Sequence, residues 1–185
     1  MLILASGSPR RKELLKKIFP EYTVIVPNVD ERLLDLDPKD LPSEESKTKA
    51  YAIHSRYPND AVLACDTIVV LDGEILGKPK DEMDAIRMLR KESGKRQVVL
   101  SGYTYIDEKK EITRTVMTYV YFNELSETLI EQYVKEKRPL DKAGAYGIQD
   151  GFPLINRIEG SFDNVMGLPT EDIAKHCLSQ SKSVL

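Results

Sequence analysis

The chain has 185 residues, of which 41% are hydrophobic and 31% charged, a composition typical of one globular domain rather than of a disordered chain. Its 27 basic and 30 acidic side chains give a net charge of −3, which argues against nonspecific nucleic-acid binding because such binding usually needs a basic excess. No apolar run approaches the roughly 18 residues of a membrane helix, and the N-terminus lacks the charge-then-apolar order of a secretory signal. We therefore expect one domain over residues 1–185, soluble in the cytoplasm and without a membrane partner.

The thiol content is low. Cys65 and Cys177 are the only cysteines, and the two histidines do not extend them into a common Cys/His zinc site without carboxylate help. Both cysteines lie in apolar segments, so we expect buried free thiols in a reducing compartment.

The first half of the chain predicts strands and helices in alternation. Apolar runs at 2–5 and 22–26 predict strands, and the spacing of Leu14, Leu15 and Ile18 predicts a helix over 10–19. The remaining elements expected here are a polar loop at 27–43, a helix at 43–57 with a weak apolar pattern, a strand at 61–71 interrupted by Asp66 and Thr67, and a hairpin turn at Asp72-Gly73 into 74–77.

The second half continues this alternation. The expected elements are a helix at 81–93, a long strand hairpin of 97–106 with 111–122, a capped helix at 126–137, a glycine-rich loop at 141–151, a strand at 153–158, a loop at 160–169 and a helix at 170–181. Interspersed strands and helices predict an α/β fold with a mixed sheet.

The first turn of the chain is a candidate phosphate site. A strand leads through Ser6-Gly7-Ser8 into a helix, where free amides and the helix dipole favour an anion and Arg10 and Arg11 add positive charge. The alternative is a capped helix with two solvated arginines, and the motif alone slightly favours it.

Asp66 is the second candidate. It interrupts a strand that is otherwise apolar, where a carboxylate is costly unless it is paired, hydrogen-bonded or bound to a metal. The alternatives are a strand break or a simple pair with a lysine, and we favour a functional role.

Two further segments are weak signals by themselves. Gly73 to Lys78 resembles a P-loop superficially, but the glycine spacing is one residue short and Pro79 stands where Ser or Thr is required. Lys78 alone is thus a surface lysine. The segment Asp141 to Gly151 is a glycine-rich turn in which Gln149 offers a donor and an acceptor.

Together these segments resemble the Maf family, in the same order along the chain. The matching segments are Leu-Ala-Ser-Gly-Ser-Pro-Arg-Arg-Lys-Glu-Leu-Leu at 4–15, Ala64 to Thr67, Gly77-Lys78-Pro79, Asp141 to Gln149, and Val165 to Pro169. The resemblance covers almost the whole chain, and the opening motif is the most specific part.

The resemblance implies a nucleoside triphosphate pyrophosphatase that releases a monophosphate and pyrophosphate with Mg²⁺ or Mn²⁺. It implies a fold similar to the inosine triphosphate pyrophosphatases, with an elongated mixed sheet, flanking helices and two lobes around a cleft. The segment Gly-Ala-Tyr-Gly-Ile-Gln resembles the branch that prefers dTTP and UTP. A homodimer is compatible with the family, although no sequence feature requires it.

The resemblance also implies roles for particular residues. Asp66 would be the general base or a metal ligand at the attacking water, and Glu31 a second carboxylate for metal or water. A lysine of the helix at 43–57 would belong to the site as well. Lys47 and Lys49 both fit, and the spacing to Asp66 favours Lys49. The triphosphate would be bound by Ser6, Ser8, Arg10, Arg11, Lys49 and Lys78, and the positions tied to substrate choice are Arg10, Thr67 and Gln149.

One position departs from the family. Gln97 stands where a histidine usually follows the Ser-Gly-Arg segment, so no family role is carried over to it. Residue chemistry also leaves the base open, because a flipped Gln149 amide can serve cytosine as well as thymine or uracil.

Two other function classes remain open. A regulator that binds nucleotides or nucleic acid in cell division would use the same cleft without turnover, but an anion binder gains nothing from Asp66 unless a metal offsets its charge. A phosphatase or nucleotidyltransferase would release phosphate or a nucleotidyl product instead of pyrophosphate. A haloacid-dehalogenase-type phosphatase also needs a second aspartate where Ile68 stands.

Overall fold

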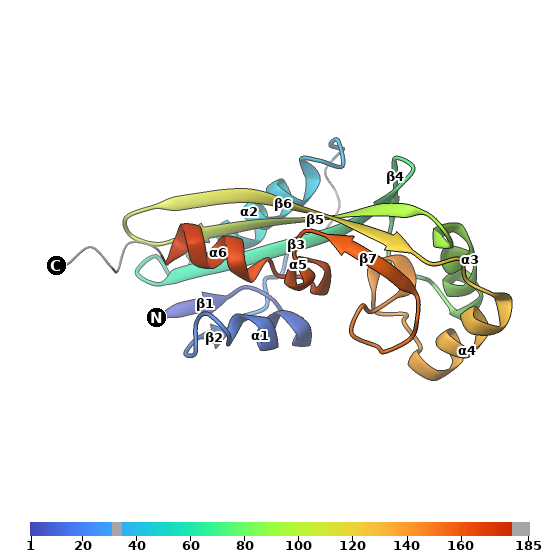
Figure 1. Ribbon diagram of the computed structural model, residues 1–185. Helices are drawn as coiled ribbons and strands as arrows, with labels where there is room; N and C mark the ends of the chain where they lie inside the picture. Colours follow the sequence, from blue (N-terminus) through green and yellow to red (C-terminus); the bar gives the residue numbers. More distant parts are fainter. Residues whose placement is uncertain (31–34, 179–185) are drawn as a thin grey trace. The chain divides into compact units, whose positions relative to one another are not determined.

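A computed structural model describes residues 1–30 and 35–178 (Figure 1). The strands are β1 (Leu2–Leu4), β2 (Thr23–Val24), β3 (Ala61–Leu71), β4 (Glu74–Leu76), β5 (Arg96–Ile106), β6 (Glu111–Phe122) and β7 (Ile155–Glu159). The helices are α1 (Pro9–Leu15), α2 (Leu41–His54), α3 (Glu82–Glu92), α4 (Glu127–Lys137), the 3₁₀ turn η1 (Ala143–Ala145), α5 (Phe162–Met166) and α6 (Thr170–Cys177).

The strands form one sheet of seven, in the order β2-β1-β3-β5-β6-β7, with β4 paired to β3. β1 runs parallel to β2 and β3, whereas β3–β4 and β6–β7 are antiparallel, so the sheet is mixed. The predicted α/β class with a mixed sheet and flanking helices is confirmed.

The described chain divides into two compact units. Unit 1 comprises the described residues among 1–67, 100–116 and 167–185, and unit 2 comprises 68–99 and 117–166.

In unit 1 the first helix is shorter than predicted. Ser8 caps α1 by accepting a hydrogen bond from the Arg11 amide, and Pro9 occupies the first turn, as expected from the sequence. The α-helix ends at Leu15, and turns follow up to Pro20. The predicted extension to residue 19 is therefore wrong, and Pro20 accounts for non-helical backbone only at residue 19.

The apolar pattern of α2 is weak because part of its buried face is polar. The helix begins at Leu41, two residues before the predicted start, and its buried face includes Glu45, Ser46 and Lys49 beside Ala50 and Ile53. Polar side chains on the inward face reduce the apolar periodicity by which such a helix is recognised. This helix therefore carries polar groups into the interior of unit 1.

The first turn of α2 lies directly on β5 at Gly102. A β-carbon at Gly102 would lie 2.2 Å from the Ser43 backbone nitrogen and 2.3 Å from the Pro42 carbonyl carbon. Only hydrogen fits at this crossing, so Gly102 sets how closely α2 approaches the strand. The core beside α2 is formed by Ile3, Ala5, Ala50, Ile53, Val62, Ala64 and Ile106.

Unit 2 begins with the predicted hairpin. Asp72 and Gly73 have φ of 50° and 78°, the left-handed backbone expected of a two-residue turn. α3 is capped by Asp81, whose side chain accepts from the Asp84 amide, and α3 packs against η1 and against α4. Helices α3 and α4 are labelled in Figure 1. The core of this unit includes Leu89, Val99, Val120, Phe122, Ile130, Tyr133 and Leu154.

The expectation of a loop throughout 160–169 is wrong, because α5 forms within it. Ser161 caps this short helix by accepting a hydrogen bond from the Asn164 amide at 3.0 Å. The Asn164 side chain is fully buried and donates to the Thr118 hydroxyl at 3.0 Å. A tertiary contact of a polar side chain thus stabilises a helix that has no apolar repeat.

β3 spans 61–71 as predicted and continues through Asp66 and Thr67, which excludes the alternative of a strand break there. α6 begins at Thr170 as predicted and ends at Cys177, and the predicted end at residue 181 lies outside the described residues. Both cysteines are free and buried, as expected. No helix of the described part of the chain is long and apolar enough to cross a membrane.

Gln97, the departure from the family pattern, has a buried acidic partner. Its side-chain nitrogen donates to Oε1 of Glu92 at 2.9 Å, and both residues are almost completely buried in unit 2. Burial raises the pKa of Glu92 well above its usual range, and the bond from Gln97 offsets part of this rise.

Glu92→Gln is expected to flatten the pH dependence of stability. A carboxyl whose pKa is raised in the folded state keeps its proton to a higher pH there than in the unfolded chain. The wild type therefore loses stability as pH rises above the pKa of the unfolded chain, near 4.5. The loss approaches about 1.4 kcal/mol per pH unit for one such group. Urea unfolding between pH 5 and 8 should show that the free energy of unfolding of the variant increases relative to that of the wild type as pH rises.

Glu108→Gln is the matched control, because Glu108 is exposed in the β5–β6 turn. Parallel stability curves for Glu92→Gln and the wild type would show that Glu92 is ionised in the folded chain.

Candidate functional site

The end of the β1–β3 ladder places two predicted segments side by side in unit 1. The parallel ladder pairs Leu4 with Leu63, and the Ala5 amide donates to the Leu63 carbonyl at 2.9 Å. Because both strands run in the same direction, the loop that follows β1 lies beside the β3 residues that follow Leu63. Asp66 and Thr67 are therefore near the Ser6–Ser8 loop, on a stretch of β3 beyond the end of β1.

The loop after β1 is ordered by its own serines. Ser6 is buried, and its hydroxyl accepts a hydrogen bond from the Ser8 amide at 3.2 Å, while the Ser8 hydroxyl accepts from the Arg11 amide at 3.3 Å. Both oxygens thus fix the backbone of the loop. α1, which follows this loop, has only seven residues.

Among the described residues of unit 1, Arg11 donates two hydrogen bonds. Its Nε donates to the Gly167 carbonyl at 2.7 Å, and Nη2 donates to the Thr67 hydroxyl at 3.1 Å. The Thr67 hydroxyl is also 2.8 Å from the hydroxyl of Ser101. These bonds join the opening motif, the Asp66 segment and the closing motif through one guanidinium group. Arg10, the neighbouring residue in α1, is partly exposed.

Asp66 and Lys49 form a buried ion pair. Their side chains are 4% and 7% exposed, and Lys49 Nζ lies 3.2 Å from Asp66 Oδ1. The second carboxylate oxygen, Oδ2, is buried and has no hydrogen-bond partner among residues 1–30 and 35–178. A buried carboxylate oxygen without a partner is costly, which indicates a site for a further ligand such as water or a cation.

Of the two lysines that fit the helix position, only Lys49 contacts Asp66. Lys47 pairs instead with Glu44 at 3.1 Å, near the surface of α2.

Sequence reasoning missed Glu45, which is buried on α2 one turn before Lys49, and Ser101, which is buried beside Thr67. The one-turn spacing of Glu45 and Lys49 was a usable signal, whereas nothing in the sequence places Ser101.

Cys65 precedes Asp66 on β3 and is fully buried. Its thiol lies 3.5 Å from the Gly167 carbonyl, the same oxygen that accepts from Arg11. Burial raises the pKa of the Cys65 thiol, and the Arg11 charge counteracts only part of this effect. Cys65 is therefore an unreactive thiol in the folded protein.

Lys78 and Gln149 lie in unit 2 on two joined loops. Both side chains are exposed. Lys78 follows β4, and the Gly144 amide donates to the carbonyl of Gly77, the residue before Lys78, at 3.1 Å. Gln149 lies a few residues after Gly144, in the turn that begins at Gly147. Unit 2 thus holds these two predicted side chains on neighbouring loops.

The remaining predicted carboxylate, Glu31, lies outside the described residues. Among the described residues no group of three His, Cys, Asp or Glu side chains could hold a metal. Mg²⁺ is commonly bound by one or two carboxylates together with substrate phosphates and water. The unpartnered Oδ2 of Asp66 fits this mode of binding.

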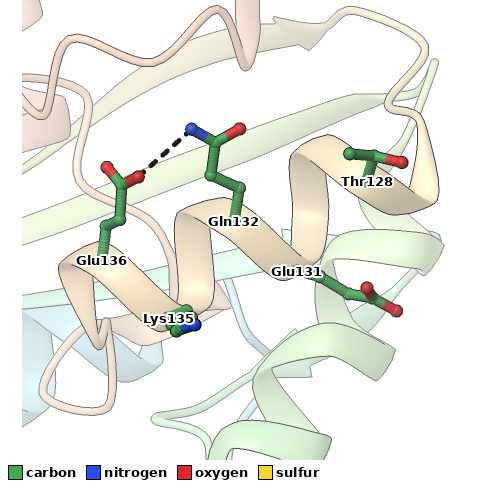
Figure 2. A pocket seen from close by; sticks show the side chains of 5 residues that line it. All are labelled: Thr128, Glu131, Gln132, Lys135 and Glu136. Carbon is green, nitrogen blue, oxygen red and sulfur yellow. Dashed lines mark hydrogen bonds between the residues drawn. The ribbon is translucent and has the colours of Figure 1, made fainter.

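A separate hollow of about 530 Å³ on α4 contains none of the predicted site residues (Figure 2). It is lined by Thr128, Glu131, Gln132, Lys135 and Glu136, and Gln132 donates to Glu136 at 3.1 Å. Since these residues all belong to one exposed helix face and carry both signs of charge, the hollow is a surface feature apart from the site.

Residues 1–179 match the family described as Maf-like protein. The chain belongs to the Maf family. A Pyrococcus abyssi member named dTTP/UTP pyrophosphatase is 46% identical over 176 residues, covering 95% of this chain and 94% of the relative. A Thermosipho africanus member with the same name is 46% identical, covering 93% and 89%.

Among solved structures, the Staphylococcus aureus Ham1 protein overlaps with 66% of this Maf-family chain and 72% of its own chain, at 19% identity. The TM-score is 0.48, too low to support an argument about shared fold or function.

Proposed function

We propose that this chain hydrolyses dTTP and UTP to the nucleoside monophosphate and pyrophosphate. The observation that carries the proposal is the 46% identity to the Pyrococcus abyssi dTTP/UTP pyrophosphatase over 95% of the chain. The buried pair of Asp66 and Lys49 beside the Ser6–Ser8 loop supports it, because carboxylate and cationic groups meet where a triphosphate could bind.

The reaction needs activation of the attacking water, a suitable charge on the activating carboxylate and neutralisation of the leaving pyrophosphate. Water attacks the α-phosphorus, the bond from that phosphorus to the bridging oxygen breaks, and pyrophosphate leaves with the electron pair. Asp66 receives the proton of the attacking water or orients that water through a bound cation. Lys49 partly neutralises the charge of the Asp66 carboxylate, and Arg10 and Arg11 balance the charge that develops on pyrophosphate.

A divalent cation, Mg²⁺ or Mn²⁺, belongs to this proposal. Asp66 would hold it through Oδ2, and Glu31 would be the second carboxylate. When bound, the cation supplies charge neutralisation at the phosphates and lowers the pKa of coordinated water. Lys49 keeps Asp66 Oδ1 engaged, which directs the free oxygen of the carboxylate to the ligand.

Residues 1–185 act as one functional domain in this proposal, and each copy of the chain carries all the proposed residues, whether it acts alone or as a homodimer. A cytoplasmic location fits the two free thiols, which persist in a reducing compartment. The cytoplasm also supplies the nucleoside triphosphates.

A product assay tests the proposal. Purified protein is incubated with a panel of nucleoside triphosphates and Mg²⁺ or Mn²⁺, and pyrophosphate is separated from phosphate. We expect pyrophosphate and monophosphate, formed fastest from dTTP and UTP. Phosphate as the product would indicate a phosphatase instead. Binding without any turnover would favour a nucleotide-binding regulator.

Gln149→Ala is expected to reduce base discrimination more than phosphate binding. The Gln149 amide can accept from N3–H of thymine or uracil and donate to a ring carbonyl, so its loss should lower kcat/KM for dTTP and UTP about tenfold or more relative to ATP. Gln132→Ala, at an exposed glutamine of α4, is the matched control. Unchanged selectivity in Gln149→Ala would remove this residue from base recognition.

A further inference from the structure

A buried hydroxyl of α4 connects the two ends of the turn that carries Gln149. The turn runs from Gly147 to Asp150 and is closed by a hydrogen bond from the Asp150 amide to the Gly147 carbonyl at 3.1 Å. The hydroxyl of Tyr133 accepts from the Gly147 amide at 2.8 Å and donates to Asp150 Oδ2 at 2.7 Å. One oxygen atom thus engages the first and the last residue of the turn.

Side chains cover the turn on its inner side. A β-carbon on Gly147 would lie 2.7 Å from Asp150 Oδ2 and 2.8 Å from Lys142 Cε, so the Asp150 carboxylate folds tightly over the glycine. Ile148 is partly buried and packs against the core of unit 2, whereas Gln149 is exposed. The turn is therefore anchored on the core side and presents Gln149 outward.

Tyr133 itself is rigidly placed. Its side chain is fully buried, and its ring meets Phe152 edge-on, with centroids 5.1 Å apart. Burial, with a smaller contribution from the bond to Asp150, raises the pKa of Tyr133 above its usual range. The hydroxyl therefore remains protonated at neutral pH and keeps donating to Asp150.

We propose that Tyr133 is a positioning residue for base recognition, which acts on Gln149 through the Gly147–Asp150 turn. The inference rests on the proposed function, because Gln149 contacts the base only if the chain binds a pyrimidine nucleotide. Tyr133 does not touch the substrate. It restricts the backbone that carries Gln149, and displacement of a recognition group by about 1 Å can cost a large factor in rate.

The test is Tyr133→Phe, which keeps the ring and removes only the hydroxyl. We expect kcat/KM for dTTP and UTP to fall about tenfold, mainly through KM. Hydrolysis of 2-deoxyribose 5-triphosphate, which has no base, should stay within about twofold of the wild type. A merely structural role would reduce both activities together.

A double-mutant cycle sharpens this test. If Tyr133 acts through Gln149, the Tyr133→Phe change should have no further effect on base selectivity in a Gln149→Ala background. Additive effects would overturn the proposal. Asp150→Ala removes the acceptor of the Tyr133 hydroxyl, should give the same selective loss, and serves if Tyr133→Phe does not fold.

Tyr105→Phe is the matched control. Tyr105 is also buried and donates to an aspartate, Asp107, at 2.9 Å, but it belongs to unit 1, whereas the turn belongs to unit 2. It should retain wild-type selectivity. If the wild type forms no pyrophosphate from any nucleotide, the proposed function fails. If the wild type is active and Tyr133→Phe matches it on every substrate, only this inference fails.

Discussion

Asp66→Asn is expected to lower kcat for dTTP and UTP by about 10²–10⁴-fold, the range typical of losing a general base. The change removes the negative charge and the proton acceptor at the unpartnered Oδ2 position while preserving the shape of the side chain. It also leaves Lys49 buried beside a neutral amide, so stability should fall as well. Steady-state pyrophosphate release and urea unfolding measure the two effects separately.

Asp172→Asn provides the control for loss of a paired carboxylate in unit 1. Asp172 accepts hydrogen bonds from Tyr103 at 2.6 Å and from Arg114 at 2.8 Å, and it is not part of the proposed site. This variant should lose stability but keep its kcat. Wild-type turnover in Asp66→Asn would exclude Asp66 from the chemistry, whatever the stability of the variant.

Gly102→Ala is expected to destabilise the protein by about 3 kcal/mol or more. The new methyl group would meet backbone atoms of Pro42 and Ser43 at 2.2–2.5 Å, and backbone cannot rotate away as a side-chain tip can. α2 must shift as a whole, and this shift would move Lys49 relative to Asp66. We therefore expect reduced turnover even in the fraction that remains folded, measured below the unfolding transition.

Gly77→Ala is the stability control for this substitution. A β-carbon at Gly77 meets nothing within 4 Å. The free energy of unfolding of Gly77→Ala should therefore remain within about 1 kcal/mol of the wild-type value. If Gly102→Ala unfolds at the same urea concentration as the wild type, α2 does not pack closely on β5 at Gly102.

The elements that could be predicted are those in which local pattern and burial agree. The Asp72-Gly73 turn and the Ser8 cap were found because each depends on a few neighbouring residues. α5 was missed because its stability depends on the contact of Asn164 with Thr118, which is remote in sequence. The early start of α2 was missed because its inward face is partly polar.

The candidate site was predictable in its residue types and less so in its contacts. A carboxylate within the apolar strand marked Asp66, and the structure adds that Lys49 is its partner. No local pattern indicates that Arg11 contacts Gly167, which is 156 residues away in sequence. Such contacts depend on the path of the whole chain, and so does the link from Tyr133 to the Gln149 turn.

The burial of Cys65 makes this residue a native reporter of fluctuations beside Asp66. A thiol-specific reagent can reach Cys65 only when β3 opens locally, so the labelling rate in native buffer measures the population of open forms. Cys177, which is also buried and whose pKa burial raises to about 11, would be replaced by alanine first. Nucleotide that slows labelling would then reveal closure of this region in a chain with no introduced probe.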